Sequence, residues 1–189
     1  MTPFEDGTPQ RSSKQLVALV ILILMSMVLS FVEFPIIPGA EWLKYDASGI
    51  VVLLTGLLYS PWIGAAVAFL AWIPHLVTNP LGAFMNIAAS VSMVVVMGLV
   101  SKRNPPVKKA ILGVLAGIVA SVAVSICMNF IVTPLYLQST YEDVVALVLP
   151  ALLPFNLVKA TINGIVALIA YQKLERLIAD NPKRDRSSS

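Results

Sequence analysis

The chain has 189 residues, of which 58% are hydrophobic and 12% are charged, and its mean hydropathy is +0.86. Soluble domains carry about 25% charged residues, so this composition excludes a soluble fold and indicates an integral membrane protein. The formal net charge is +3, and the single cysteine, Cys127, excludes an intrachain disulfide.

Six apolar stretches, separated by polar residues, glycine and proline, predict six transmembrane helices. They cover residues 15–33, 46–60, 62–78, 81–100, 109–132 and 144–172. At a rise of 1.5 Å per residue, runs of about 16 to 23 apolar residues match the core of a bilayer. The first run is too long for a signal-peptide core and is expected to remain as a helix. The sequence therefore predicts an all-α integral membrane protein with six helices in one bundle.

Proline punctuates these predicted helices. Pro61 is expected to open the third helix, and Asn79 with Pro80 to end it. Pro74, Pro150 and Pro154 are expected to kink or shorten their helices, because proline lacks the N–H of the helical hydrogen bond.

Basic residues predict the orientation. With six helices, 11 of the 13 lysines and arginines fall on one side of the membrane: Arg11, Lys14, Lys102, Arg103, Lys108, Lys109, Lys173, Arg176, Lys183, Arg184 and Arg186. By the positive-inside rule, this side and both termini are cytoplasmic. We therefore expect a cytoplasmic tail at 1–14, a membrane domain at 15–172 in contact with lipid, and a basic cytoplasmic tail at 173–189.

Polar residues interrupt three of the predicted helices. Asn156, Lys159 and Asn163 are spaced i, i+3 and i+7, so they lie on one helical face, while Asn86 and Asn129 lie in the fourth and fifth helices. A charge in mid-helix costs about 2.5 to 3.5 kcal/mol on insertion scales, which favours a functional role for Lys159. Amides both donate and accept hydrogen bonds, so the set predicts a pocket for a polar, largely uncharged ligand.

Two structural alternatives remain open. Intramembrane asparagines also join helices by hydrogen bonds, and a lysine side chain can extend toward the membrane surface.

His75 has no histidine or cysteine near it at metal-ligand spacing, so we expect a packing or ligand-gate role and no metal. The chain lacks nucleotide-binding and hydrolase motifs, and no acid or nucleophile accompanies Lys159. We predict neither a catalytic residue, nor a cofactor, nor a nucleic-acid partner.

Four segments resemble a known family: FPIIPGAEWLKYD, LLYSPWIGA, GAFMNIAAS and NLVKATINGIVALIAY. In these, and from the first helix to Tyr171, the chain resembles the riboflavin-specific substrate-binding (S) component of energy-coupling factor vitamin transporters. The resemblance implies a six-helix protein of the bacterial cell membrane that binds riboflavin from outside and is not an enzyme. It implies three further partners, a transmembrane coupling subunit and two cytoplasmic ATPases.

The resemblance also implies roles for residues. The segment Leu43, Lys44, Tyr45 and Asp46 would cover the vitamin, and Asn86, Asn129, Asn156, Lys159 and Asn163 would line its pocket. The outer half then offers only Lys44 and Lys159 as cations, which favours the neutral vitamin over its phosphorylated form.

In the first helix, the family uses two small residues four apart to contact the coupling subunit. The match here is Ala18 with Leu22, and Ser26 with Ser30 supplies a small pair further along that favours close helix packing. We expect these four residues to contact the coupling subunit. The chain also departs from the family at Gly49, where an acidic residue is usual, and at Ser60, where glycine is usual.

Three other functions stay open. An S component for another vitamin, such as thiamine or pantothenate, would share the scaffold. A membrane scaffold protein of similar hydropathy would use the polar residues only between helices. A self-sufficient secondary carrier is disfavoured, because no inverted repeat or intramembrane carboxylate for proton coupling is evident.

Overall fold

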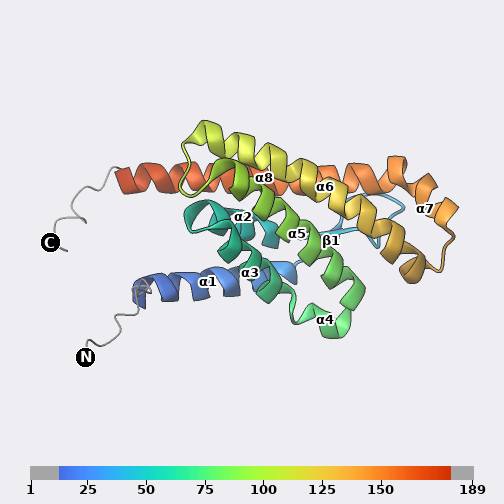
Figure 1. Ribbon diagram of the computed structural model, residues 1–189. Coiled ribbons are helices and arrows are strands. Elements are labelled where there is room, and N and C mark those ends of the chain that lie inside the picture. The colour runs from blue at the N-terminus through green and yellow to red at the C-terminus, as the bar shows by residue number, and fades with distance from the viewer. Residues whose placement is uncertain (1–12, 180–189) are drawn as a thin grey trace, which may run out of the picture.

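Helices that run back and forth make up most of residues 13–179, the part of the chain that this computed structural model describes (Figure 1). The elements in chain order are α1 (Ser13–Ser30), β1 (Phe34–Pro35), β2 (Lys44–Tyr45), α2 (Ser48–Leu58), α3 (Pro61–Trp72), α4 (His75–Thr78), α5 (Pro80–Ser101), α6 (Val107–Leu137), α7 (Tyr141–Leu147), the π-helical turn η1 (Val148–Leu152) and α8 (Leu153–Ala179). Most of the predicted N-terminal tail and the last ten residues of the predicted C-terminal tail lie outside the described residues.

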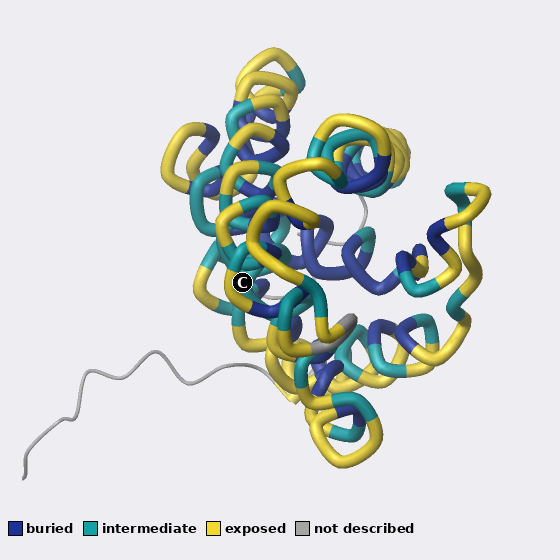
Figure 2. The backbone as a smooth tube through the Cα atoms, turned by 90° about the vertical axis from the view of Figure 1, so that its right-hand side faces the viewer, coloured by how far each residue is buried: buried dark blue, intermediate teal, exposed yellow. Residues whose placement is uncertain are grey.

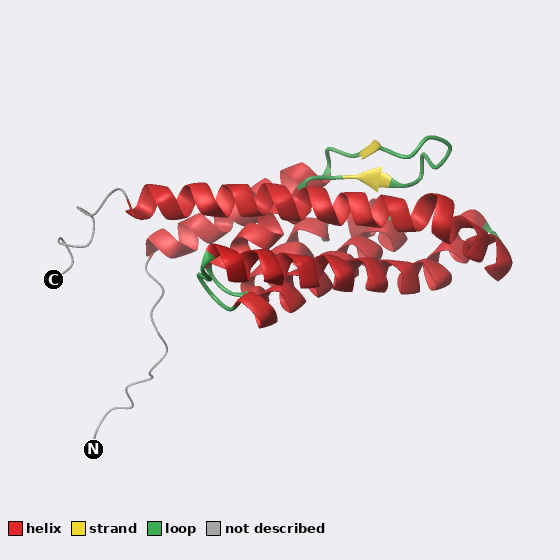
Figure 3. Ribbon diagram, turned by 90° about the horizontal axis from the view of Figure 1, so that it is seen from above, coloured by secondary structure: helices red, strands yellow, loops and turns green. Residues whose placement is uncertain are grey.

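Six of the helices lie alongside one another. Helix α5 packs along α6 and α3, α8 packs on α6 and α2, and α1 packs on α2 and α3. The start of α1 and the end of α8 lie at one end of the bundle, and α4 and α7 lie at the other (Figure 1). Between α1 and α2, the chain forms a loop beside the helices (Figure 3).

That loop corrects the all-α expectation. Strands β1 and β2 form a small antiparallel hairpin, in which Phe34 pairs with Tyr45 and Pro35 with Lys44. The aromatic rings of Phe34 and Tyr45 lie 5.3 Å apart between centroids. The sequence predicted only a loop here, because two-residue strands are too short to show the alternation of apolar and polar residues that is typical of a strand.

Helix boundaries follow the capping residues. The Oγ of Ser60 accepts a hydrogen bond from the N–H of Ile63 at 3.2 Å, and Pro61 opens α3. Similarly, Oδ1 of Asn79 accepts from the N–H of Gly82 at 3.0 Å, and Pro80 opens α5. These turns return the chain sharply, which keeps consecutive helices adjacent.

Three predicted segments differ in detail. The third divides at Pro74 into α3 and α4, as proline predicts, whereas the fifth continues through Pro134 to Leu137. The sixth begins as α7, widens into η1 around Pro150, and extends past the predicted boundary to Ala179. Pro154 follows just after η1, so the wider helical turn and the two prolines occur together.

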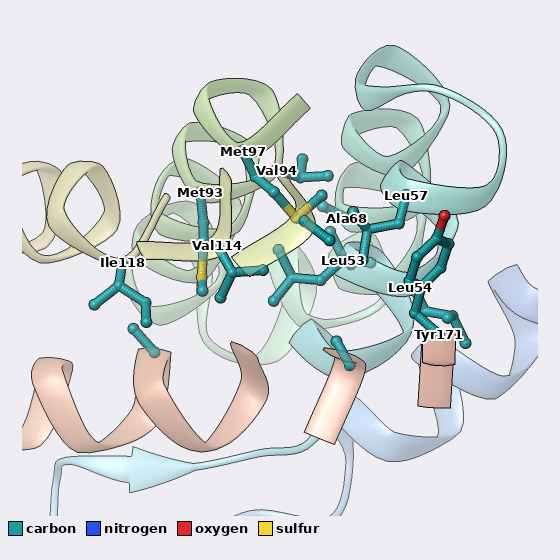
Figure 4. Packing of buried hydrophobic residues seen from close by; sticks show 14 of the residues in the cluster. Leu53, Leu54, Leu57, Ala68, Met93, Val94, Met97, Val114, Ile118 and Tyr171 are labelled. Carbon is teal, nitrogen blue, oxygen red and sulfur yellow. The ribbon is translucent and has the colours of Figure 1, made fainter. Parts of the chain in front are cut away.

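The core lies where α2, α3, α5, α6 and α8 meet. Met93, Val94 and Met97 of α5 point toward Leu53 and the other labelled side chains in Figure 4. Close approach of α5 and α6 depends on small residues: a Cβ at Gly113 would lie 2.7 Å from the carbonyl oxygen of Met97, and one at Gly117 would lie 2.6 Å from that of Met93. This spacing is a small-x-x-x-small packing motif.

The outer surface is apolar. Buried segments gather inside the bundle and exposed ones face outward in the view along its axis (Figure 2). Among the exposed side chains are Leu99, Val119, Ile131 and Leu149. By length and composition, three helical stretches within the described residues are suited to crossing a membrane, at Pro80–Ser101, Val107–Leu135 and Tyr141–Leu177. Shorter apolar helices cover Gln15–Ser30, Ser48–Leu58 and Pro61–Trp72.

Candidate functional site

A cavity opens among the hairpin loop, α2, α5, α6 and α8, in the half of the bundle away from the start of α1. Its volume is about 120 Å³ on the scale where one water needs about 10 to 15 Å³. The space therefore admits a small organic molecule rather than a few waters. The binding-site residues predicted from the sequence that line it are Leu43, Lys44, Asn86, Asn129, Asn156, Lys159 and Asn163.

Lys159 lies at the centre of the polar wall. Its Nζ donates to Oδ2 of Asp46 and to Oδ1 of Asn86, both at 2.6 Å. Nζ also lies 5.9 Å from the centroid of the Phe155 ring. The ammonium group is thus held by a carboxylate and an amide from two other parts of the chain, while its side chain keeps 15% of its surface exposed.

Asp46 lies behind Lys159 and outside the lining. Its Oδ1 accepts from the N–H of Ser48 at 3.1 Å and from the Ser48 hydroxyl. The indole N–H of Trp72 donates to that same hydroxyl at 3.3 Å. Both carboxylate oxygens are therefore engaged, and the side chain is only 2% exposed.

Tyr45 also acts from behind the lining. Its hydroxyl donates to Oδ1 of Asn163 at 3.0 Å. Burial, with the negative charge of Asp46 adding to it, raises the pKa of the Tyr45 phenol, so the hydroxyl keeps its proton. The departure at Gly49 has a steric reason here, because a Cβ would lie 2.5 Å from Nδ2 of Asn163.

The wall from α6 was only partly predicted. Nδ2 of Asn129 donates to the carbonyl of Ser125 at 2.7 Å, and its Oδ1 accepts from the hydroxyl of Thr133 at 2.8 Å. Ser121, Ser125 and Thr133 line the cavity with Asn129. From this helix, the sequence predicted only Asn129. The four-residue spacing of these four side chains in an apolar helix is a signal that could have found the other three.

The amides of α5 and α8 are partly occupied by their own helices. Nδ2 of Asn86 donates to the carbonyl of Gly82 at 3.1 Å, and Nδ2 of Asn156 donates to that of Leu152 at 2.7 Å. Each NH₂ group has a second hydrogen, which remains available for a ligand.

The rest of the cavity is largely apolar. Its apolar lining includes Trp42, Val52, Leu53, Met85, Met93 and Phe155. Such a combination of apolar walls with a few placed polar groups is typical of small-molecule binding sites.

The hairpin loop covers the site. Leu43 and Ala40 pack with Val144 of α7 and Leu152 of η1 in a small apolar cluster. At the loop surface, Nζ of Lys44 lies 3.6 Å from a carboxylate oxygen of Glu33. The apolar contacts with α7 and η1 hold the loop over the cavity.

The predicted partner-contact residues of α1 face different ways. Ser26 and Ser30 are fully buried: the Ser26 hydroxyl donates to the Ser48 carbonyl at 3.2 Å, and the Ser30 hydroxyl donates to the Met27 carbonyl at 2.7 Å. In this structure both side chains therefore pack within the bundle and have no exposed surface for the expected contact with another subunit. Ala18 and Leu22 are half-buried.

His75 packs next to this region. Its Nε2 lies 2.9 Å from the Ser30 hydroxyl, and its ring lies 4.3 Å from that of Phe31 and 4.5 Å from that of Trp72. It does not line the cavity. Across residues 13–179, we find no group of three histidine, cysteine or acidic side chains placed to hold a metal ion.

Fold and site together define a helical membrane protein with a cavity of ligand size near one end. The family model for the substrate-specific component of ECF transporters matches residues 14–171, and the chain belongs to this family. The family comprises substrate-binding components of transporters and not enzymes.

Individual relatives agree with this assignment. The chain is 26% identical to the riboflavin transporter RibU of Staphylococcus aureus over 177 residues, which is 89% of this chain and 94% of the relative. It is 25% identical to the riboflavin transporter RibU of Streptococcus thermophilus over 180 residues, 88% of this chain and 85% of that one. The solved structure of the S component of a bacterial ECF transporter is similar with a TM-score of 0.76 and 25% identity, covering 87% of this chain and 97% of the other.

Proposed function

We propose that this protein is the riboflavin-binding S component of an energy-coupling factor transporter and captures vitamin B2 for uptake into the cell. The observation that supports this most is the cavity, in which five polar residues from three apolar helices meet under a loop. The two relatives named above are riboflavin transporters, which favours riboflavin over other vitamins.

The lining suits the two ends of riboflavin. Asn129, Asn156 and Asn163 offer amides to the uracil-like edge of the ring and to the ribityl hydroxyls, while Lys159 donates to a carbonyl or hydroxyl. The apolar side chains accept the dimethylbenzene end. Leu43 and Lys44 of the loop would cover the bound vitamin.

We further propose six membrane spans with both termini in the cytoplasm. Alternating helix directions and the basic residues at the end away from the cavity support this topology. The cavity then faces the outside of the cell. The proposed division is a cytoplasmic tail at 1–14, a membrane domain at 15–172 and a cytoplasmic tail at 173–189, with residues 173–179 continuing α8.

Transport requires energy from other subunits. The sequence contains no G-x-x-x-x-G-K-[ST] motif, so we assign ATP hydrolysis to two separate cytoplasmic ATPases and coupling to a transmembrane subunit. We place the coupling contact on the face of α1 that includes Ala18 and Leu22.

A fluorescence titration of the detergent-purified protein tests the function. Riboflavin is expected to bind with 1:1 stoichiometry and with its fluorescence quenched, whereas thiamine and pantothenate are expected not to compete. If riboflavin fluorescence is not quenched, direct binding of thiamine or of pantothenate, measured by calorimetry, would instead assign the protein to that vitamin. Absence of binding by all three would favour the scaffold alternative.

A further inference from the structure

The charge inside the cavity depends on one buried ion pair. Among the described residues, Lys44 and Lys159 are the charged residues in the lining. The Lys44 side chain is 52% exposed, and its pair with Glu33 is open to water, which screens it. Lys159 instead pairs with Asp46, whose side chain is almost fully buried.

The side chain of Asp46 is held in place by groups that do not line the cavity. The backbone N–H and the hydroxyl of Ser48 both donate to its Oδ1, and Trp72 donates to that hydroxyl in turn. Ser48 begins α2, and the positive end of a helix dipole favours an anion at this position. The other oxygen, Oδ2, is directed at the Lys159 ammonium.

From this geometry we propose that Asp46 is a specificity-determining residue that sets the preference of the cavity for an uncharged ligand. It holds Lys159 against Asn86 as a hydrogen-bond donor and at the same time cancels its positive charge. This inference rests on the proposed function and deepens it, because it names the residue that separates riboflavin from riboflavin 5′-phosphate.

The physical reason is the cost of removing a phosphate from water. A phosphate monoester carries a charge of about −1.5 to −2 at pH 7, and a buried charge is costly without a cation to compensate it. Because Asp46 already compensates Lys159, the buried wall offers this anion no uncompensated positive charge, and Lys44 is exposed to water. Neutral riboflavin still receives the hydrogen bond from Nζ.

The test replaces Asp46 with asparagine, which keeps the size and the acceptor for Ser48 but removes the negative charge. At pH 7, in detergent, the dissociation constants of riboflavin and of riboflavin 5′-phosphate are measured for each variant. For Asp46→Asn, we expect the ratio of the phosphate constant to the riboflavin constant to fall at least tenfold relative to the unsubstituted protein. The matched control Ser48→Ala keeps both charges and is expected to change both constants by the same factor.

A second variant tests the same idea in the opposite direction. Lys159→Gln leaves the Asp46 charge uncompensated and is expected to raise the ratio, while Asp46→Asn combined with Lys159→Gln returns it to within about threefold of the original. This cycle separates charge from structure, since a purely structural role for Asp46 would weaken both ligands in parallel. If Asp46→Asn does not fold, the ratio measured for Lys159→Gln still tests the proposal.

Two outcomes overturn different claims. The first outcome is that the unsubstituted protein binds riboflavin but the ratio of the two dissociation constants is unchanged in Asp46→Asn. If Asp46→Asn does not fold, an unchanged ratio in Lys159→Gln counts in the same way. The proposed role of Asp46 is then wrong, and the proposed function stands. If the unsubstituted protein binds neither flavin, the proposed function fails, and this inference with it.

Discussion

Lys159 connects three parts of the chain at one point: the loop through Asp46, α5 through Asn86, and its own helix α8. A charge-assisted hydrogen bond contributes about 1.5 to 3 kcal/mol, roughly twice a neutral one. One side chain therefore orders the cavity wall and keeps one N–H that can donate to a ligand.

This arrangement predicts how alanine variants of the lining bind riboflavin. Lys159→Ala is expected to weaken binding by about ten- to hundredfold, because a charged donor is worth about 1.5 to 3 kcal/mol and 1.4 kcal/mol is tenfold in affinity. Asn156→Ala and Asn163→Ala are each expected to cost about two- to tenfold, as for neutral hydrogen bonds. Titration of flavin fluorescence measures all three.

Gln172→Ala provides the control for these variants. Gln172 lies on the same helix, about 20 Å beyond Lys159 at 1.5 Å per residue, and is expected to leave affinity unchanged. Unaltered affinity in all three lining variants would contradict the assignment of the cavity as the binding site.

At this scale the sequence predicts the helical polar residues better than their partners. Asn86, Asn129, Asn156 and Asn163 stand out because amides are rare in apolar helices. The partner of Lys159 does not, since Asp46 is 113 residues away and reads as a residue of an exposed loop. No local pattern encodes a pairing over that distance.

Among the elements, the pair α5 and α6 forms the wall most dependent on close packing. Gly113 and Gly117 bring α6 against the backbone of α5 at Met97 and Met93. Met93 also lines the cavity, so this approach fixes the width of the site.

Gly117→Leu is therefore expected to destabilise the bundle. Overpacking costs about 1 to 3 kcal/mol, and here the first added atom already meets a backbone oxygen, which cannot move as a side chain does. A lower midpoint of thermal unfolding in detergent is the expected result. Val119→Leu is the control, because Val119 is 70% exposed on the outer face of the same helix. Equal midpoints for the two variants would show that the helices do not approach so closely.

Periodicity predicts where the helices lie but not which way each one faces. Helix α1 is apolar nearly all round, so no stripe identified its buried side, and the sequence did not show that Ser26 and Ser30 are buried inside the bundle. The breaks in the third and sixth segments were signalled by Pro74 and Pro150, whereas the hairpin of two-residue strands was too short to give a pattern.

For the whole molecule, the bundle has a basic end and an end with the cavity. The start of α1 and the end of α8 lie at the basic end (Figure 1), which the proposed topology places in the cytoplasm by the positive-inside rule. In this proposed topology, the loop over the cavity faces the outside, which is the side from which we propose that riboflavin is captured.

Labelling of single cysteines tests this orientation. In a Cys127→Ser background, Glu41→Cys is expected to react with a membrane-impermeant maleimide in intact cells, because Glu41 is exposed in the outer loop. Lys173→Cys, exposed at the other end, is expected to react only after permeabilisation. The reverse pattern would invert the topology.

The most direct measurement is the visible absorbance spectrum of the protein purified in detergent from cells grown with riboflavin. A cavity that holds riboflavin under a closed loop is expected to retain it, giving flavin bands at close to one flavin per protein, with a clear loss in Lys159→Ala. A colourless protein that also leaves the fluorescence of added riboflavin unquenched would contradict riboflavin capture.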